Sequence, residues 1–215
     1  MTKIAIFGVT GYTGHYVATE ALKRGLEVVG LGRSVPKEPI EGVEYVAGYA
    51  FDQADRAKIL EGADAVLMKL APKGPLETKI RDLYATITDE VPEGARLVVA
   101  GGWSSLLGPD GTRQVHSWPD PDGRLTAYKQ LAGIADDLEA RTDNVQWTYI
   151  TPPNVYGGAV PPQRTVSEYR LGGATPLPPH EGDDHTWISG ENYAQAIVDL
   201  LTSQEHIHEV VNAAA

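Results

Sequence analysis

The 215-residue sequence contains no cysteine, which excludes a disulfide scaffold, a cysteine nucleophile and any thiolate-bound metal or iron–sulfur site. It also has no apolar run near the ~18 residues that a membrane helix needs. The apolar run Ile4–Phe7 is too short for a signal peptide, so we expect a cytoplasmic protein that does not enter a membrane.

Basic residues are few and scattered. The chain has 18 Lys and Arg against 29 Asp and Glu, a formal net charge of −11. Binding to a phosphate backbone depends on Lys and Arg that release counterions, and no basic stripe is present. The composition therefore excludes nucleic acid as an expected partner.

Short apolar runs alternate with segments of helical periodicity. This pattern predicts an α/β fold of the Rossmann type, a doubly wound and mostly parallel sheet with helices on both faces and a small C-terminal cap. The expected strands are 3–7, 27–31, 43–46, 64–68, 96–100, 147–150 and 209–212, with a short one near 169–171; helical patterns surround Val17–Leu22, Ile59, Leu76–Ile87, Leu131–Leu138 and Tyr193–Leu201.

The amino-acid composition of the chain changes after the sixth expected strand. Residues 157–179 are rich in Gly and Pro, which favours loops. We therefore expect a nucleotide-binding core at residues 1–156 and a small substrate-side portion at residues 157–215, packed on the same domain.

A glycine-rich loop follows the first expected strand and opens the first expected helix. Its residues Gly8, Gly11 and Gly14 form the pattern GxxGxxG. In such a loop the first glycine permits a tight turn, the second lets the backbone approach a pyrophosphate, and the third lets helix and strand pack closely. The N–H groups at the helix start then face the phosphates. This context predicts a dinucleotide site.

The end of the second expected strand bears on the choice of cofactor. An acidic residue at this place binds the ribose 2′-OH of NAD, whereas an arginine accommodates the 2′-phosphate of NADP. This chain has Arg33 and Ser34 there and no carboxylate. The sequence favours NADP(H), and NAD(H) stays an alternative.

The second half of the chain carries further motifs. They include the strand end Trp147–Pro153, the segment Arg164–Gly173 and the pair Asn192–Tyr193. Together with the glycine loop, they resemble the NAD(P)H-binding proteins of the atypical short-chain dehydrogenase/reductase group, related to NADH–flavin reductases, biliverdin/flavin reductases and NmrA-like proteins.

The resemblance implies a cofactor laid across the carboxyl edge of the sheet. The glycine loop would surround the pyrophosphate, the second strand's end would hold the adenosine ribose, and the loops after the fourth, fifth and sixth strands would flank the bridging ribose and the nicotinamide. In chain order the implied cofactor residues are Gly8, Thr10, Gly11, Tyr12, Thr13, Gly14, Arg33, Ser34, Lys69, Leu70, Ala71, Gly101, Gly102, Trp103, Pro153 and Asn154.

The sequence also departs from those relatives. Trp103 and Ser104 replace small residues after the fifth strand, and Tyr49-Ala50 stands where relatives often have an adenine-contacting Asp-Val. Trp103 either narrows or stacks on the substrate, or is an ordinary packed residue. The Tyr-x-x-x-Lys pair of carbonyl-reducing members is absent, so we assign no catalytic residue.

These observations favour an NAD(P)H-dependent reductase that transfers hydride to a flavin, a quinone or a similar planar acceptor. Hydride transfer to such acceptors does not need the tyrosine that acts as the acid in the Tyr-x-x-x-Lys pair. The alternative is a non-catalytic NADP(H)-binding redox sensor of the NmrA-like type. The His and Asp residues of 180–185 lie in a Pro-rich loop, and we expect no metal site. Formation of a homodimer is left open.

Overall fold

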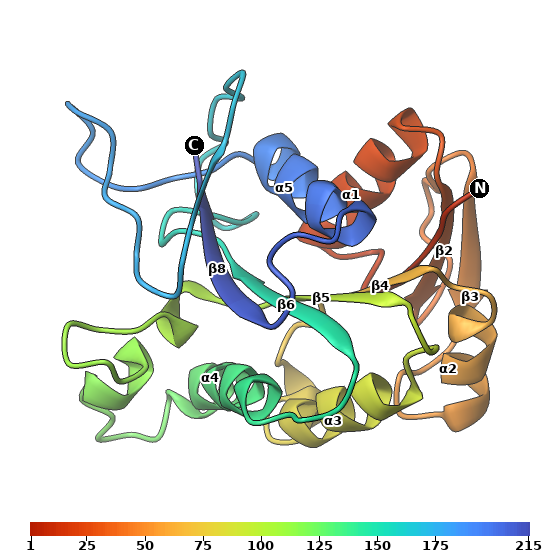
Figure 1. Ribbon diagram of the computed structural model, residues 1–215, viewed down its shortest axis with the longest axis horizontal. Helices are drawn as coiled ribbons and strands as arrows, with labels where there is room; N and C mark the ends of the chain where they lie inside the picture. The colour runs from red at the N-terminus through yellow and green to blue at the C-terminus, as the bar shows by residue number, and fades with distance from the viewer.

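The computed structural model describes all residues, 1–215, as one eight-stranded sheet covered by helices on both faces (Figure 1). The strands are β1 Lys3–Phe7, β2 Glu27–Gly32, β3 Val43–Ala47, β4 Ala65–Met68, β5 Arg96–Ala100, β6 Gln146–Thr151, β7 Arg170–Gly172 and β8 Glu209–Ala214. The helices are α1 Tyr12–Lys23, α2 Gln53–Leu60, α3 Ile80–Glu90, α4 Thr126–Glu139 and α5 Gly190–Thr202, with short 3-10 turns η1 Gly74–Leu76, η2 Trp103–Ser105 and η3 Gln114–Ser117.

The sheet order is β3-β2-β1-β4-β5-β6-β8-β7. Every pairing is parallel except that of β7 with β8. The order of the first six strands matches the doubly wound dinucleotide-binding arrangement, with its reversal between β1 and β4. The predicted Rossmann-type α/β fold is confirmed.

The helices form two layers. Helices α1 and α5 pack together on one face, and α2, α3 and α4 cover the other (Figure 1). The central strands β4 and β5 are buried at every residue, because parallel strands are covered on both sides. This is why they appear in the sequence as continuous apolar runs. None of the helices has both the length and the apolar content to cross a bilayer.

Local signals place the helix boundaries. Asp52 starts α2 by accepting hydrogen bonds from the backbone N–H groups of Ala54 and Asp55. Ser189 starts α5 by accepting one from the N–H of Asn192. The chain leaves α1 through Gly25, whose φ of +75° is costly for other residues.

Two buried asparagines fix the long loop that follows β6. The Asn192 side chain accepts a hydrogen bond from the N–H of Val166 and donates one to its carbonyl, both at 2.9 Å. Asn212 on β8 accepts from the N–H of Leu177 at 2.9 Å and donates to the carbonyl of Thr151 at 3.1 Å. The loop is therefore attached to α5 and to the sheet. The predicted division at residue 156 stays a prediction.

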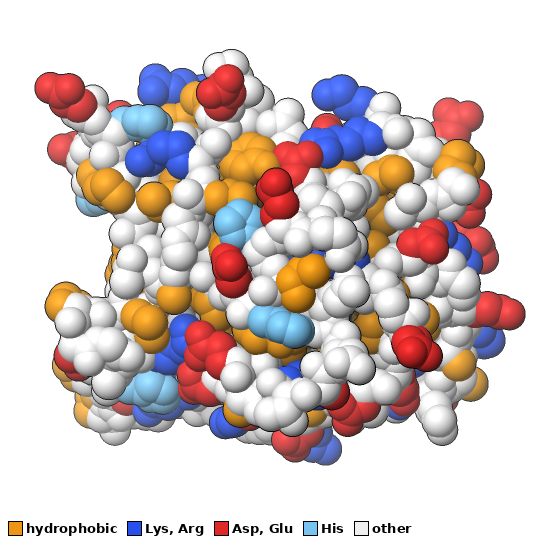
Figure 2. All heavy atoms as spheres, in the orientation of Figure 1, with side chains coloured by type: hydrophobic (Ala, Val, Ile, Leu, Met, Phe, Trp, Pro, Cys, Tyr) orange, Lys and Arg blue, Asp and Glu red, His pale blue; other side chains and the backbone are white.

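Loops from two distant parts of the chain extend to one side of the sheet. Figure 1 shows the green segment after β5 and the cyan-to-blue segment after β6 both at the left. Figure 2 shows the outline of the molecule indented between them, with acidic and basic side chains interspersed over this face. Parallel sheets bind ligands at the carboxyl ends of their strands, where these loops begin.

Candidate functional site

The glycine loop joins β1 to α1 and is packed against the end of β4. Gly8 has a φ of +95°, and a Cβ there would lie 2.2 Å from the carbonyl oxygen of Lys69. A Cβ on Gly14 would lie 2.2 Å from the carbonyl oxygen of Gly8. Both positions therefore exclude side chains through contacts within the protein. Gly11 is less constrained, since a Cβ there would lie 3.3 Å from the Gly8 oxygen, a tight contact but not an overlap.

The start of α1 has free hydrogen-bond donors. Gly11 precedes the helix without a capping side chain, and no acidic residue occupies the first turn. The first N–H groups of a helix have no partner inside it, and the helix dipole favours an anion there. An uncapped helix start that directly follows a glycine-rich loop fits the pyrophosphate of a dinucleotide.

Tyrosines pack around the first turn of α1. The Thr13 hydroxyl lies 2.8 Å from the Tyr156 hydroxyl, and the Tyr12 ring lies edge-on to the Tyr156 ring at 5.5 Å. A Cβ on Gly158 would lie 3.3 Å from the Tyr12 ring. Tyr156 thus ties the loop after β6 to the glycine loop. Tyr156 was not identified as a site residue from the sequence. Its position two residues after Asn154, a predicted site residue, was the available signal.

The end of β2 lies beside the glycine loop. A Cβ on Gly32 would lie 2.9 Å from the Thr10 methyl group, which shows how closely the two segments pack. Arg33 and Ser34 follow and are exposed, and the Arg33 guanidinium makes no hydrogen bond or ion pair. Tyr49, after β3, is 63% exposed. A free guanidinium and an exposed ring therefore occupy the edge where the adenosine ribose is expected.

Lys69 lies between the glycine loop and the end of β5. Its backbone N–H donates to the Phe7 carbonyl at 3.0 Å, and its ammonium donates to the Gly101 carbonyl at 3.0 Å. Burial lowers the pKa of the Lys69 amine to about 8. The next residue, Leu70, donates its N–H to the Tyr84 hydroxyl at 2.8 Å, and Ala71 after it is exposed.

The chain after β5 runs against a buried tyrosine. A Cβ on Gly101 would lie 2.0 Å from the Tyr149 hydroxyl, so only glycine fits. That hydroxyl donates to the Leu131 carbonyl at 2.9 Å and lies 2.9 Å from the Ser105 hydroxyl. Burial raises the pKa of Tyr149 to about 12, so the phenol stays neutral. Gly102 follows and is partly exposed.

Three partly exposed aromatic rings lie beyond Gly102. The Trp103 and Trp118 rings are stacked, with centroids 5.8 Å apart and planes 24° apart. The Tyr128 ring contacts Trp118 edge-on at 6.3 Å and is 48% exposed. We call these three side chains the aromatic wall. Trp118 and Tyr128 were not predicted as site residues. They lie in or near a Pro- and Asp-rich segment, and its sequence does not indicate that these rings contact each other and Trp103.

Buried Arg113 holds the segment that carries the aromatic wall. Its guanidinium donates to the Ser105 carbonyl at 3.0 Å, to Asp136 at 2.9 Å and to Glu139 at 2.5 Å. The two carboxylates are on α4, one helical turn apart. The η2–η3 segment is therefore fixed to α4, which keeps Trp103 in place.

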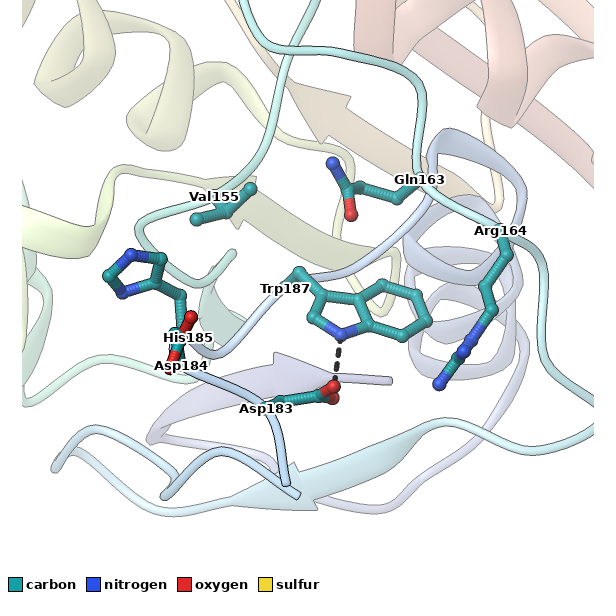
Figure 3. A pocket seen from close by; sticks show the side chains of 7 residues that line it. All are labelled: Val155, Gln163, Arg164, Asp183, Asp184, His185 and Trp187. Atoms are coloured by element: carbon teal, nitrogen blue, oxygen red, sulfur yellow. Dashed lines mark hydrogen bonds between the residues drawn. The ribbon is translucent and has the colours of Figure 1, made fainter. Parts of the chain in front are cut away.

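An open cavity of about 410 Å³ lies beyond the end of β6 (Figure 3). Pro153 is buried and Asn154 exposed at this end, and the next residue, Val155, bridges to Trp187. In Figure 3 the Trp187 ring lies at the centre, with the Arg164 guanidinium 5.0 Å from the ring centroid and Asp183 accepting the indole N–H at 3.0 Å. The remaining lining residues are polar: Gln163, Asp184 and His185.

No group of three or more His, Asp or Glu side chains is placed to hold a metal ion in the structure. Asp183, in the histidine-containing loop, is instead bonded to Trp187. The predicted site residues come from the loops after β1, β2, β4, β5 and β6. Close contacts link Thr10 to Gly32, Gly8 to Lys69, and Lys69 to Gly101.

A doubly wound sheet with a glycine loop and an uncapped helix start defines the class of Rossmann-type nucleotide-binding proteins. The sequence profile of the NAD(P)H-binding family matches residues 8–204, so the chain belongs to that family. The resemblance found in the sequence is thereby confirmed, and nicotinamide cofactor binding follows from membership of the family.

Individual relatives are similar over almost the whole chain. The YwnB protein of Bacillus subtilis is 28% identical over 96% of this chain and 95% of its own length. A solved structure from Streptococcus pneumoniae, named "a putative NADH-flavin reductase", has a TM-score of 0.83 and 25% identity over 100% of this chain and 99% of that one. A Burkholderia pseudomallei protein has a TM-score of 0.81 and 28% identity over the full length of both chains.

Proposed function

We propose that this protein is an NADPH-dependent oxidoreductase that transfers hydride to a planar acceptor such as a quinone or a flavin. The observation that carries the proposal is the placement of stacked aromatic rings two residues beyond Gly101, at the same sheet edge as the glycine loop. Planar ligands stack favourably on such rings.

The preference for NADPH over NADH rests on Arg33 and Ser34. The Arg33 guanidinium is exposed and has no protein partner, and no carboxylate follows β2. A planar guanidinium can donate two parallel hydrogen bonds to a phosphate. Residues of the glycine loop, together with Leu70 and Ala71, would hold the rest of the cofactor, whose bound nicotinamide supplies the hydride.

The acceptor class rests on the aromatic wall and on what the chain lacks. No tyrosine is followed four residues later by a lysine, so the usual acid of carbonyl-reducing relatives is missing. Trp103 and Trp118 offer a flat apolar surface, and the pneumococcal neighbour bears a flavin reductase name. Together these features favour a flat conjugated acceptor and the atypical, short-chain type of reductase.

The polar cavity beyond β6 would receive the more polar end of the acceptor. Arg164, Gln163 and His185 offer donors there, whereas Asp183 is engaged by Trp187. A ligand held by the aromatic wall at one end and by this cavity at the other would cover the nicotinamide.

A titration tests the proposal directly. NADPH and NADH are added in turn and their binding is followed by nicotinamide fluorescence, whereas binding of NADP is followed by its displacement of NADPH. Oxidation is followed by absorbance with FMN, FAD or a soluble quinone present. We expect tight NADPH binding and turnover with at least one acceptor. Binding without turnover would overturn the reductase and support the redox sensor, and absence of binding would overturn the nucleotide site.

A further inference from the structure

Lys69 bridges the two segments between which the nicotinamide end of the cofactor is expected. Its backbone touches the glycine loop, since its carbonyl oxygen is the atom that excludes a Cβ from Gly8. Its side chain crosses to the neighbouring strand and donates to the Gly101 carbonyl at 3.0 Å. Trp103 of the aromatic wall lies two residues further along. The ammonium is therefore placed at the junction of the cofactor and acceptor segments.

The Lys69 ammonium is not neutralised by the protein. No carboxylate lies within ion-pair distance of it, and one of its three N–H donors is used. Among the titratable residues of the neighbouring elements, burial raises the pKa of the phenols of Tyr12 on α1, Tyr84 on α3 and Tyr149 on β6, so these three are uncharged. The hydrogen bond to Gly101 therefore leaves the positive charge and the remaining N–H donors of Lys69 available to a ligand.

We propose that Lys69 is the proton donor of the hydride-transfer reaction, a catalytic residue that takes the place of the missing tyrosine–lysine pair. The inference rests on the proposed function. Hydride addition brings one hydrogen nucleus and two electrons to the acceptor and leaves a negative charge on its oxygen or ring nitrogen. The Lys69 N–H bond then breaks, a new O–H or N–H bond forms on the acceptor, and the neutral amine takes a proton back from water.

Two properties of the side chain suit this role. A positive charge at this point stabilises the negative charge as it develops on the acceptor. A general acid works best when its pKa is near the operating pH, and burial brings the pKa of this amine to about 8. The need for a donor is greater for a quinone, whose charge resides on oxygen, than for a flavin, whose charge is spread over a ring.

Lys69→Met tests the proposal, because methionine keeps the length and removes the charge and the protons. We expect kcat with a quinone to fall by about 100-fold and the fall with FMN to be smaller. The dissociation constant for NADPH, measured by fluorescence without an acceptor, should change less than about threefold. Lys23→Met is the matched control, since Lys23 is 72% exposed at the far end of α1 and should leave both quantities unchanged.

The pH dependence separates a proton donor from a fixed charge. In the wild-type protein kcat should fall as the pH rises through about 8, because the amine loses its proton. Lys69→Arg keeps the charge but cannot release a proton, so we expect a reduced kcat that no longer falls above pH 8. An NMR titration of the lysine ε-carbons should show one signal that titrates near pH 8 and is lost in Lys69→Met.

Each outcome decides a different question. If the wild-type protein binds NADPH but reduces nothing, the proposed function fails and the role of Lys69 fails with it. If the wild-type protein turns over and Lys69→Met keeps kcat within about threefold, the proton-donor role is overturned and the reductase stands. A weakened NADPH affinity with kcat unchanged at saturation would also overturn it, because Lys69 would then only bind the cofactor. If Lys69→Met does not fold, the pH profile of Lys69→Arg decides alone.

Discussion

The proposed cofactor side and the proposed acceptor side of this site are built in different ways. On the cofactor side, Gly8 and Gly14 pack backbone against backbone, with distances that leave no room for a Cβ. On the acceptor side, side chains make the contacts: Trp103 stacks on Trp118, and Arg113 holds their segment to α4. A surface made of backbone tolerates few substitutions, whereas a surface made of side chains can change its ligand by single substitutions. The comparison predicts that cofactor binding and acceptor choice can be altered separately.

The largest expected effect is that of Gly8→Ala, which would break the cofactor side. The new methyl would meet the Lys69 carbonyl at 2.2 Å with φ at +95°. Overpacking and backbone strain together should lower the free energy of unfolding by about 3–5 kcal/mol, and NADPH binding should be lost. Urea unfolding and fluorescence titration measure the two effects.

Gly62→Ala is the matched control for this change. Gly62 also has a positive φ, +67°, but nothing lies within 4 Å of its Cβ position. We expect a loss of about 1 kcal/mol from the backbone conformation alone, with NADPH binding retained. Equal losses for the two variants would show that the close approach of Gly8 to Lys69 is unimportant.

Arg33→Ala should sharpen the comparison by altering the cofactor side without unfolding it. Loss of a charge-assisted contact with the 2′-phosphate should weaken NADPH binding by about 10- to 100-fold and leave NADH binding unchanged. Arg33→Lys keeps the charge but not the planar fork, and it should give an intermediate value. Equal weakening of NADPH and NADH would contradict the assignment of Arg33 to the phosphate.

Trp103→Ala should affect the acceptor side alone. Removal of a stacking surface should raise KM for a quinone by about five- to tenfold, while the dissociation constant for NADPH stays within twofold of the wild-type value. Trp103→Phe keeps a ring and should recover part of the loss. A change in NADPH affinity as large as the change in KM would show that the two sides are not separable.

The sequence alone predicts the cofactor side because its signals are local. Residues 8–14 form one continuous motif directly after a buried strand, and the central strands appear as apolar runs because both their faces are covered. The predicted helix near Leu131 begins earlier, at Thr126, since the polar first turn of α4 shows no apolar periodicity.

The acceptor side could not be predicted in the same way because its contacts join distant segments. Trp103 and Trp118 are separated by a Gly- and Pro-containing stretch, and Val155 and Trp187 by the whole loop after β6. One signal was available, the pair Asp136 and Glu139 on one face of α4, which suits a cationic partner such as Arg113. Even this pair does not identify which arginine it binds.

The smallest expected change is in the stability of Lys69→Met. Lys69 belongs to both sides of the comparison, since it contacts Gly8 and Gly101. Its pKa of about 8 lies below the value of about 10.5 expected for an unfolded chain, so the unfolded state holds more protons between these two pH values. The cost of burying the charge is therefore fully present below pH 8 and disappears as the pH rises toward 10.5. At pH 7, Lys69→Met should be more stable than the wild type by about 1 kcal/mol, because relief of charge burial exceeds the lost hydrogen bond to Gly101. Urea unfolding at pH 7 and pH 10 should show this difference shrinking with pH, and a difference that stays constant or grows would show that the Lys69 charge carries no burial cost.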